Sequence, residues 1–290
     1  MRNNNKSIVL AILAAALYAI SSPVSKLLLK EIPPTMMAAL LYLGAGTGML
    51  IFGIIQKKFG NKTNELHLSK DEMPFVIGMI VLDTAAPIFL MIGLTLTSSE
   101  NTSLLNNFEI VATSIIALFI FKETISKRLW LGIGLITLSS IILSVEDISS
   151  FSFSFGSIFV LLACICWGFE NNCTRMLSKK DPLEVVILKG FGSGIGSLII
   201  AFILNETINN FTYLALALIL GFVSYGLSIF FYVYAQRELG AAKTSAYYAI
   251  SPFIGVAFSF LIFKDIPTVS FIVALMIMII ATYLVSTDNK

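Results

Sequence analysis

The chain has few charged residues for its length. Only 12% of its 290 residues are Asp, Glu, Lys or Arg, whereas about a quarter are charged in an ordinary soluble domain. Hydrophobic residues make up 57% of the chain, and the mean hydropathy is +0.90. This composition excludes an ordinary soluble domain and predicts a protein that lies mostly within a membrane.

Histidine and cysteine are also scarce. The one histidine, His67, lies in a polar stretch, and the three cysteines, Cys164, Cys166 and Cys173, all fall within one apolar segment. A structural metal site needs several such side chains at suitable spacing, and no second cysteine cluster is available for disulfide pairing. We therefore expect the cysteines to be small apolar core residues, and we expect no metal and no cofactor.

Motifs for nucleotide binding and for catalysis are missing. The sequence contains no Gly-x-x-x-x-Gly-Lys-Ser/Thr loop, so ATP hydrolysis is not expected as an energy source. It contains no His-Glu-x-x-His, no paired aspartate motif and no serine–histidine arrangement. Glycines recur in Gly44-x-Gly46-x-Gly48, but no strand precedes them, which argues against a dinucleotide loop. The chain is therefore not expected to be an enzyme.

What the sequence has instead is a series of long apolar segments. A hydrocarbon core about 30 Å thick needs roughly 20 apolar residues per helix. Such segments must be helical because lipid cannot satisfy free backbone groups, and they lack the alternation of a membrane β-barrel. Ten segments meet or approach this length: Ser7–Leu29, Thr35–Ile55, Met73–Thr95, Glu100–Phe121, Leu129–Val145, Ser154–Leu177, Leu183–Leu204, Phe211–Ala235, Ala241–Phe263 and Thr268–Val285. The first resembles a signal peptide in its flanking charges, but its apolar run is too long for a cleaved one.

The basic residues predict the orientation of the chain. With the N-terminus in the cytoplasm, fourteen of the 19 Lys and Arg residues fall in cytoplasmic segments. Two, Lys30 and Lys264, fall in outer loops, and three, Lys26, Arg175 and Lys189, lie within spans. The positive-inside rule then predicts a multi-pass protein of the cytoplasmic (inner) membrane with both termini in the cytoplasm. No basic run suggests a nucleic-acid partner.

The chain also contains an internal repeat. Thr102-Ser103 to Phe121-Lys122-Glu123 returns as Thr244-Ser245 to Phe263-Lys264-Asp265, at a constant offset of 142 residues. Each copy would hold five spans, and an odd number of spans forces the second copy to lie inverted in the membrane. We predict an all-α membrane protein of ten transmembrane helices in two inverted five-helix repeats, residues 1–147 and 148–290.

Other segments align between the two halves. The second and seventh segments share glycine-rich interiors, Gly44-x-Gly46-x-Gly48 and Gly192-x-Gly194-x-Gly196, which let helix backbones approach closely in lipid. The paired positions elsewhere are Tyr18 with Trp167, Ser21 with Glu170, Ser22 with Asn171 and Lys26 with Arg175, all at offset 149, and Asp83 with Tyr225 at offset 142.

Ten spans in two halves of five, a length of 290 residues, and a Phe-Lys-Glu/Asp ending to the fourth and ninth spans together resemble one known family. The chain resembles the drug/metabolite transporter superfamily, EamA type. The resemblance implies a central cavity lined by both halves, and members of the family export amino acids and other metabolites or carry other small solutes. It does not name the substrate.

Polar residues follow one face of the fourth segment. Thr102, Asn106, Glu109 and Thr113 have the spacing i, i+4, i+7, i+11, so a continuous helix would place them on one side. The offset of 142 gives Thr244, Tyr248, Ser251 and Gly255 on the ninth segment. A polar stripe is costly in lipid, so we expect it to face the bundle interior, where it either lines a cavity or forms hydrogen bonds between helices.

Three carboxylates lie at membrane depth: Asp83, Glu109 and Glu170. A charge at the bilayer centre costs about 2.5–3.5 kcal/mol on insertion scales, so each needs a partner or a use. Burial disfavours the charged form, which makes Glu109 and Glu170 candidates for proton coupling. Asp83 either supports a helix kink at Pro87 or contacts substrate. Lys189 either extends to the cytoplasmic surface or pairs with Glu170.

Tyrosine and tryptophan in mid-span can stack planar solutes or hold cations, and Pro23, Pro87 and Pro252 mark possible helix breaks. The predicted substrate-binding residues are Tyr18, Ser21, Ser22, Asp83, Asn106, Glu109, Trp167, Glu170, Asn171, Lys189, Tyr225, Tyr248 and Ser251.

The predicted function is secondary transport of small metabolites, such as amino acids or amines, by alternating access in which one half rocks against the other. Export is favoured by the resemblance, and proton coupling stays open. The alternatives are a flippase for lipids or lipid-linked solutes and a non-transporting scaffold. The expected partners are a small solute, lipid and, if transport is coupled, protons; the oligomeric state stays open.

Overall fold

The structure is a computed structural model that describes residues 2–58, 66–122, 125–147, 152–177, 180–239, 244 and 247–287. Within these ranges, nine helical segments are long and apolar enough to cross a membrane, and a tenth, Ser251–Phe263, is shorter. The protein is therefore an all-α membrane protein with ten apolar helical segments. Glu123, Ser245 and the start of the expected ninth segment at Ala241 lie outside the described residues.

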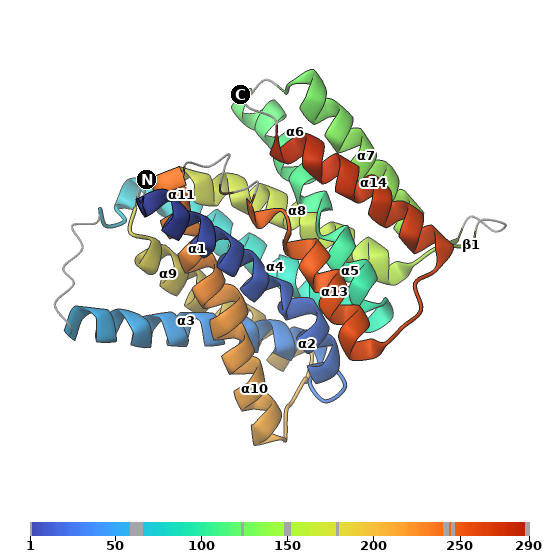
Figure 1. Cartoon of the computed structure of the whole chain (residues 1–290). Helices are drawn as coiled ribbons and strands as arrows, with labels where there is room; N and C mark the ends of the chain where they lie inside the picture. The colour runs from blue at the N-terminus through green and yellow to red at the C-terminus, as the bar shows by residue number, and fades with distance from the viewer. Residues whose placement is uncertain are drawn as a thin grey trace.

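Figure 1 shows the helices and their order along the chain. The first half contains α1 (Arg2–Ala19), α2 (Ser21–Leu28), α3 (Pro34–Lys58), the 3-10 turn η1 (Lys70–Glu72), α4 (Met73–Leu96), α5 (Ser99–Leu105), α6 (Phe108–Phe121) and α7 (Lys127–Ser144). Two short antiparallel strands follow, β1 (Val145–Asp147) and β2 (Ser152–Phe153). The second half contains α8 (Phe155–Met176), α9 (Pro182–Ile203), α10 (Phe211–Gly221), the π-helix η2 (Phe222–Leu227), α11 (Ser228–Leu239), α13 (Ser251–Phe263) and α14 (Val269–Ser286).

The repeated Phe-Lys-Glu/Asp sequence has a structural basis. Lys122 ends α6 with a φ of 54°, and Lys264 ends α13 with a φ of 58°. Both residues adopt the left-handed conformation that commonly terminates helices. The next helices begin with equivalent caps, since Ser126 accepts from the Leu129 backbone N–H and Thr268 from that of Phe271. The repeated sequence therefore marks the end of one helix and the start of the next.

Several expected single helices are broken. The fourth segment turns at Asn106 and Asn107, between α5 and α6, so it is not the one continuous helix on which the polar stripe was predicted. The Asn107 amide donates to the Leu104 carbonyl at 3.4 Å, and such local side-chain bonds compete with helical ones. The equivalent turn in the ninth segment falls at Ala249 and Ile250.

The prolines do not all interrupt their helices. The first segment breaks at Ile20, three residues before Pro23, and the turn at Ile250 lies just before Pro252. At Pro87 the expected break is absent, since α4 is helical from Met73 to Leu96. Neighbouring helices in a membrane can hold a helix together across a proline, and α4 packs along both α8 and α9.

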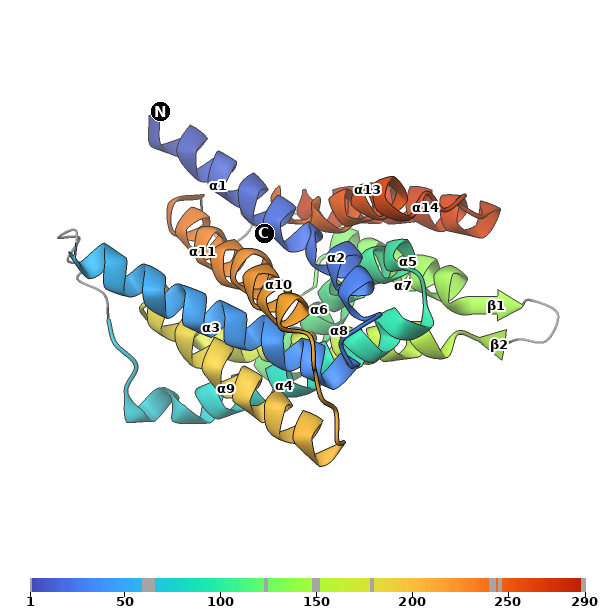
Figure 2. The ribbon, with the colours of Figure 1, turned by 90° about the horizontal axis from the view of Figure 1, so that it is seen from below.

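The packing of α3 on α9 shows how the two halves are related. A side chain at Gly46 would meet the Phe191 backbone N at 2.9 Å, and one at Gly194 would meet the Leu43 side chain at 2.8 Å. An offset of 148 residues relates Gly46 to Gly194 and Leu43 to Phe191, so each contact is the equivalent of the other. A two-fold axis between the helices produces this relation. Because Leu43 to Gly46 runs past Gly194 to Phe191 in reverse order, α3 and α9 are antiparallel (Figure 2). The two repeats are therefore inverted.

The halves interleave instead of forming two separate bodies. The helix α4 packs along α8, α1 along α11, and α7 along α14, and each pair takes one helix from each half. The two halves are therefore packed against each other through several pairs of helices.

Glycine contacts in the centre provide the first prediction. A Cβ at Gly190 would lie 2.4 Å from the Gly46 backbone N, whereas nothing lies within 4 Å of one at Gly134. Overpacking costs about 1–3 kcal/mol, so Gly190→Ala should lower the thermal unfolding midpoint of the detergent-solubilised protein. The matched substitution Gly134→Ala should leave it unchanged. Equal midpoints for the two variants would contradict the close approach of α3 and α9.

Candidate functional site

A buried ion-pair network joins three helices. The Lys189 ammonium on α9 lies 2.9 Å from Asp83 Oδ2 on α4 and 2.9 Å from Glu170 Oε1 on α8. The Tyr42 hydroxyl donates to Asp83 Oδ1 at 3.0 Å, and the Thr174 hydroxyl donates to Glu170 Oε1. The exposed fractions of Asp83 and Glu170 are 0% and 2%. Two carboxylates therefore share one ammonium in a site shielded from solvent.

This network decides between the alternatives that the sequence left open. Lys189 does not extend to the membrane surface, and it forms the expected ion pair with Glu170. It also binds Asp83, which the sequence did not predict. Asp83 does not support a kink at Pro87, because its two oxygens contact Lys189 and Tyr42 instead of free backbone groups.

A second polar group lies on α6 and α8. The Asn171 amide donates to Glu109 Oε1 at 2.5 Å and to Thr113 Oγ1 at 3.2 Å. All three side chains are partly exposed. In the described part of the chain, no basic side chain lies within ion-pair distance of Glu109. Among the described residues, the hydrogen-bond partner of the Glu109 carboxylate is thus the neutral amide of Asn171.

Tyrosines form the opposite side of the site. The Tyr18 ring lies 5.8 Å from that of Tyr225 and 6.0 Å from that of Tyr248, centroid to centroid. Tyr225 in turn lies 5.2 Å from Tyr42, and Tyr232 lies 5.0 Å from Tyr248. These tyrosines come from the first, second, eighth and ninth segments, so helices of both halves contribute to one aromatic cluster.

Sequence reasoning missed Tyr42 and Tyr232. Tyr42 lies two residues before the Gly44-x-Gly46-x-Gly48 run and is buried in mid-span. That position was a usable signal, because a buried tyrosine hydroxyl seeks a partner. Tyr232 carried no comparable signal, since it lies among phenylalanines and other aromatic residues in the eighth segment.

The internal symmetry of the fold is broken at this site. Asp83, Glu170 and Glu109 correspond in the other half to Tyr225, Ser21 and Ser251. Each carboxylate is therefore matched by a neutral hydroxyl. The Ser21 hydroxyl donates directly to the Tyr225 hydroxyl at 3.3 Å, where the corresponding pair, Glu170 and Asp83, is joined through Lys189. The carboxylates on α4, α6 and α8 form an acidic wall. The serine hydroxyls and the tyrosines form a hydroxyl and tyrosine wall, and the Tyr42–Asp83 hydrogen bond joins the two.

The remaining predicted residues contribute differently. The Ser251 hydroxyl donates to the Ala15 carbonyl at 2.8 Å and so ties α13 to α1. Asn106 lies at the α5–α6 break, where its side-chain oxygen is buried without a hydrogen-bond partner. Trp167 is buried on α8. Ser22 is buried on α2 and joins none of these contacts.

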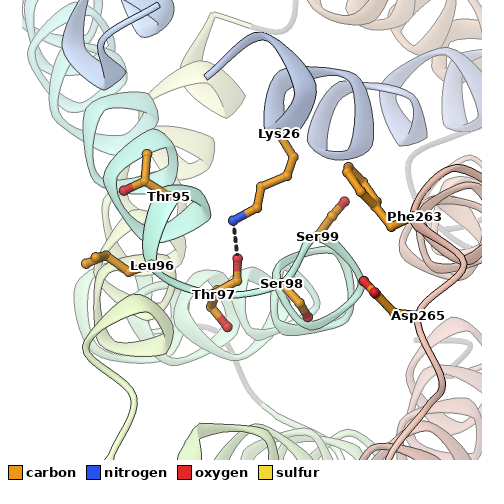
Figure 3. Close-up of a pocket in the computed structure, with 8 residues that line it drawn as sticks. All are labelled: Lys26, Thr95, Leu96, Thr97, Ser98, Ser99, Phe263 and Asp265. Carbon is orange, nitrogen blue, oxygen red and sulfur yellow. Dashed lines mark hydrogen bonds between the residues drawn. The ribbon is translucent and has the colours of Figure 1, made fainter. Parts of the chain in front are cut away.

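A cavity of about 340 Å³, shown in Figure 3, shares no lining residue with this polar centre. Its walls come from α2, the α4–α5 connection and the end of α13. It is lined by Lys26, Thr95, Leu96, Thr97, Ser98, Ser99, Phe263 and Asp265. None of the residues predicted to bind substrate lines it.

The ion-pair network provides the second prediction. Breaking a buried ion pair by removing one partner costs about 3–5 kcal/mol, because the other charge stays buried without compensation. Lys189→Met should therefore lower the thermal unfolding midpoint strongly. Lys180→Met is the matched control, because Lys180 pairs with Glu72 at the surface. Adding Asp83→Asn and Glu170→Gln to Lys189→Met should recover stability. Lys189→Met and Lys180→Met unfolding at the same temperature would contradict the network.

Comparisons with known proteins agree with this architecture. An uncharacterized transporter of Methanothermobacter thermautotrophicus is 28% identical over 272 residues, which cover 88% of this chain and 78% of the relative. The uncharacterized transporter YyaM of Bacillus subtilis is 22% identical over 213 residues, 70% of each chain. A solved crystal structure, 12% identical, has a TM-score of 0.68 over 96% of this chain and 95% of its own, which shows a shared fold.

A family model matches the chain twice, once in each half. The model describes the EamA-like transporter family, and it matches residues 5–145 and 154–287. Together these matches cover nearly the whole chain and include both walls of the polar site. The chain belongs to the EamA-like transporter family.

Proposed function

We propose that this membrane transporter carries small metabolites, such as amino acids or amines, across the cytoplasmic membrane by alternating access, as a secondary transporter that works as an exporter. Both termini lie in the cytoplasm in this proposal, and the repeats span residues 1–147 and 148–290. The observation that carries the proposal is Glu109, a carboxylate in the membrane interior that no basic side chain of the described residues neutralises.

The surroundings of Glu109 suit a cationic group. Glu109 lies in the first turn of α6, where the helix dipole favours a negative charge. Tyr18 and Tyr248 lie close enough to interact with it electrostatically. A solute ammonium bound at Glu109 would have a carboxylate on one side and tyrosine rings nearby, which can contribute cation–π contacts.

The charge balance of the acidic wall supports coupling to a cation. If all groups are ionised, Asp83, Glu109 and Glu170 carry three negative charges and Lys189 carries one positive charge. A net negative charge in the membrane interior is unfavourable. A proton or the positive group of a solute would reduce it, so Glu109 and Glu170 serve as the proposed sites of proton exchange.

The two walls suggest which parts move. Asp83, Glu109, Glu170 and Lys189 lie on α4, α6, α8 and α9, whereas the opposite wall draws on α1, α2, η2 and the turn before α13. We assign the two moving groups to these two sets, each of which contains helices from both halves. Separating them would expose Glu109 and the tyrosines to one side of the membrane at a time.

The substrate class is tested by a thermal-shift screen of the purified protein with amino acids, amines, nucleosides and organic acids. A ligand that binds the folded state raises its unfolding temperature. We expect amino acids or amines to do so, and the selected solute is then used in transport assays. Stabilisation by nucleosides or organic acids alone would contradict the proposed class.

Transport in proteoliposomes provides the third prediction. A hydrogen bond to a charged group is worth about 1.5–3 kcal/mol, so Glu109→Gln should reduce the transport rate at limiting substrate by roughly tenfold or more. Glu31→Gln, an exposed site outside the polar centre, should transport at the wild-type rate. Wild-type transport by a variant carrying both Glu109→Gln and Glu170→Gln would rule out a role for these carboxylates.

Water access to the site provides the fourth prediction. Asn106 is partly exposed and lies beside Glu109 at the helix break. In a variant with the three native cysteines replaced by alanine, Asn106→Cys should react with a water-soluble maleimide. A cysteine at Ser139, which is buried between α7 and α14, should not. Equal reactivity at the two positions would contradict a solvent-accessible path to Glu109.

A further inference from the structure

The cavity at the end of α2, α4 and α13 brings residues of both halves together. Lys26, Thr97, Ser98 and Ser99 come from the first half, and Phe263 and Asp265 come from the second. Figure 3 shows the Lys26 ammonium and the Asp265 carboxylate on different sides of this cavity. The polar centre around Glu109 does not use either residue, so the cavity needs its own explanation.

Lys26 is positioned by the end of α4. Its ammonium donates to the Leu94 carbonyl and, at 2.7 Å, to the Thr97 carbonyl, which are groups that a helix end leaves without intrahelical partners. An ammonium has three N–H donors, and these two bonds use two of them. One donor therefore stays available for an acceptor in the cavity.

Asp265 supplies the opposite charge. The left-handed Lys264 ends α13, and Asp265 follows it at an exposed position. Within the described residues, no hydrogen bond or ion pair is recorded for the Asp265 carboxylate. The cavity thus presents a free N–H donor of a cation and an unpaired anion, with serine and threonine side chains between them.

The floor of the cavity is closed. Ser99 lines the cavity, and its hydroxyl forms a hydrogen bond of 2.7 Å with that of Ser259 on α13. Further along the same contact, a Cβ at Gly255 would lie only 2.9 Å from Ser103 Oγ. Because α5 and α13 meet this closely, a solute in the cavity rests outside the contact between the halves.

We propose that this cavity is a second binding site, which takes a small zwitterion of the α-amino acid type. The carboxylate of the ligand binds Lys26, and its ammonium binds Asp265. A volume of about 340 Å³ is at the small end of ligand pockets, which begin near 300 Å³. A solute that carries both charges can contact Lys26 and Asp265 at the same time. The solute class rests on the proposed function, whereas the site itself rests on the cavity and its two charges.

Cysteine protection tests the site. Thr97→Cys, in the variant without native cysteines, places a thiol at the cavity wall, and a water-soluble maleimide measures its reactivity in the full-length protein. An equimolar mixture of neutral α-amino acids should slow the reaction severalfold. Ethylamine and propionate, which carry one charge each, should not slow it.

Three substitutions in the same background assign the charges. Asp265→Asn and Lys26→Gln should each remove the protection, and Lys30→Gln, an exposed lysine near the same end that does not line the cavity, should retain it. Asp265 is exposed, so Asp265→Asn is expected to fold even if Lys26→Gln does not. Absence of protection by amino acids, equal protection by ethylamine or propionate, or protection that persists in Asp265→Asn would each overturn the proposal.

The same assay separates this site from the polar centre. Glu109→Gln should still show protection at Thr97→Cys, because Glu109 does not line the cavity. Protection without transport of any solute by the wild-type protein would contradict the proposed function and leave the cavity site intact. Transport of an amino acid without protection would contradict the cavity site and leave the proposed function intact.

Discussion

The structure depends on neutralising charge in a place that water does not reach. Asp83, Glu170 and Lys189 lie on three helices, and the Lys189 ammonium lies 2.9 Å from an oxygen of each of the two carboxylates. None of these groups is stable alone in the membrane interior. Their mutual contact therefore fixes the register of α4, α8 and α9, and α4 brings the first half into a network whose other two members come from the second half.

This network also explains why the duplicated fold is not a symmetric one. The inverted repeats give equivalent backbones, as the reciprocal contacts of Gly46 with Phe191 and of Gly194 with Leu43 show. The side chains differ, because the positions equivalent to the carboxylates carry the hydroxyls of Tyr225, Ser21 and Ser251. Duplication thus supplies two equivalent backbones, and substitution places the carboxylates at one of each pair of equivalent positions.

The same division appears in the close contacts between helices. Gly255 lets α13 approach Ser103 on α5, whereas the equivalent position in the other half is Thr113, whose hydroxyl accepts a hydrogen bond from Asn171. Gly255 therefore allows two helices to pack closely, whereas Thr113 forms part of the polar site. Equivalent positions therefore have different roles in the two halves.

The sequence by itself determined the ten apolar segments and the two repeats, and it offered the pairing of Lys189 with Glu170 as one of two alternatives. These follow from local properties, since hydropathy, repeat offset and depth in a span are all read along one chain. Only the tertiary structure decided that Lys189 also binds Asp83, that Asn171 holds Glu109, that Tyr42 joins the site and that Lys26 and Asp265 share a cavity. Each of these contacts joins segments far apart in sequence, and their partners depend on which helix faces pack together. Periodicity predicts which side of one helix is polar or apolar. Which other helix packs against that side depends on the packing of the whole bundle.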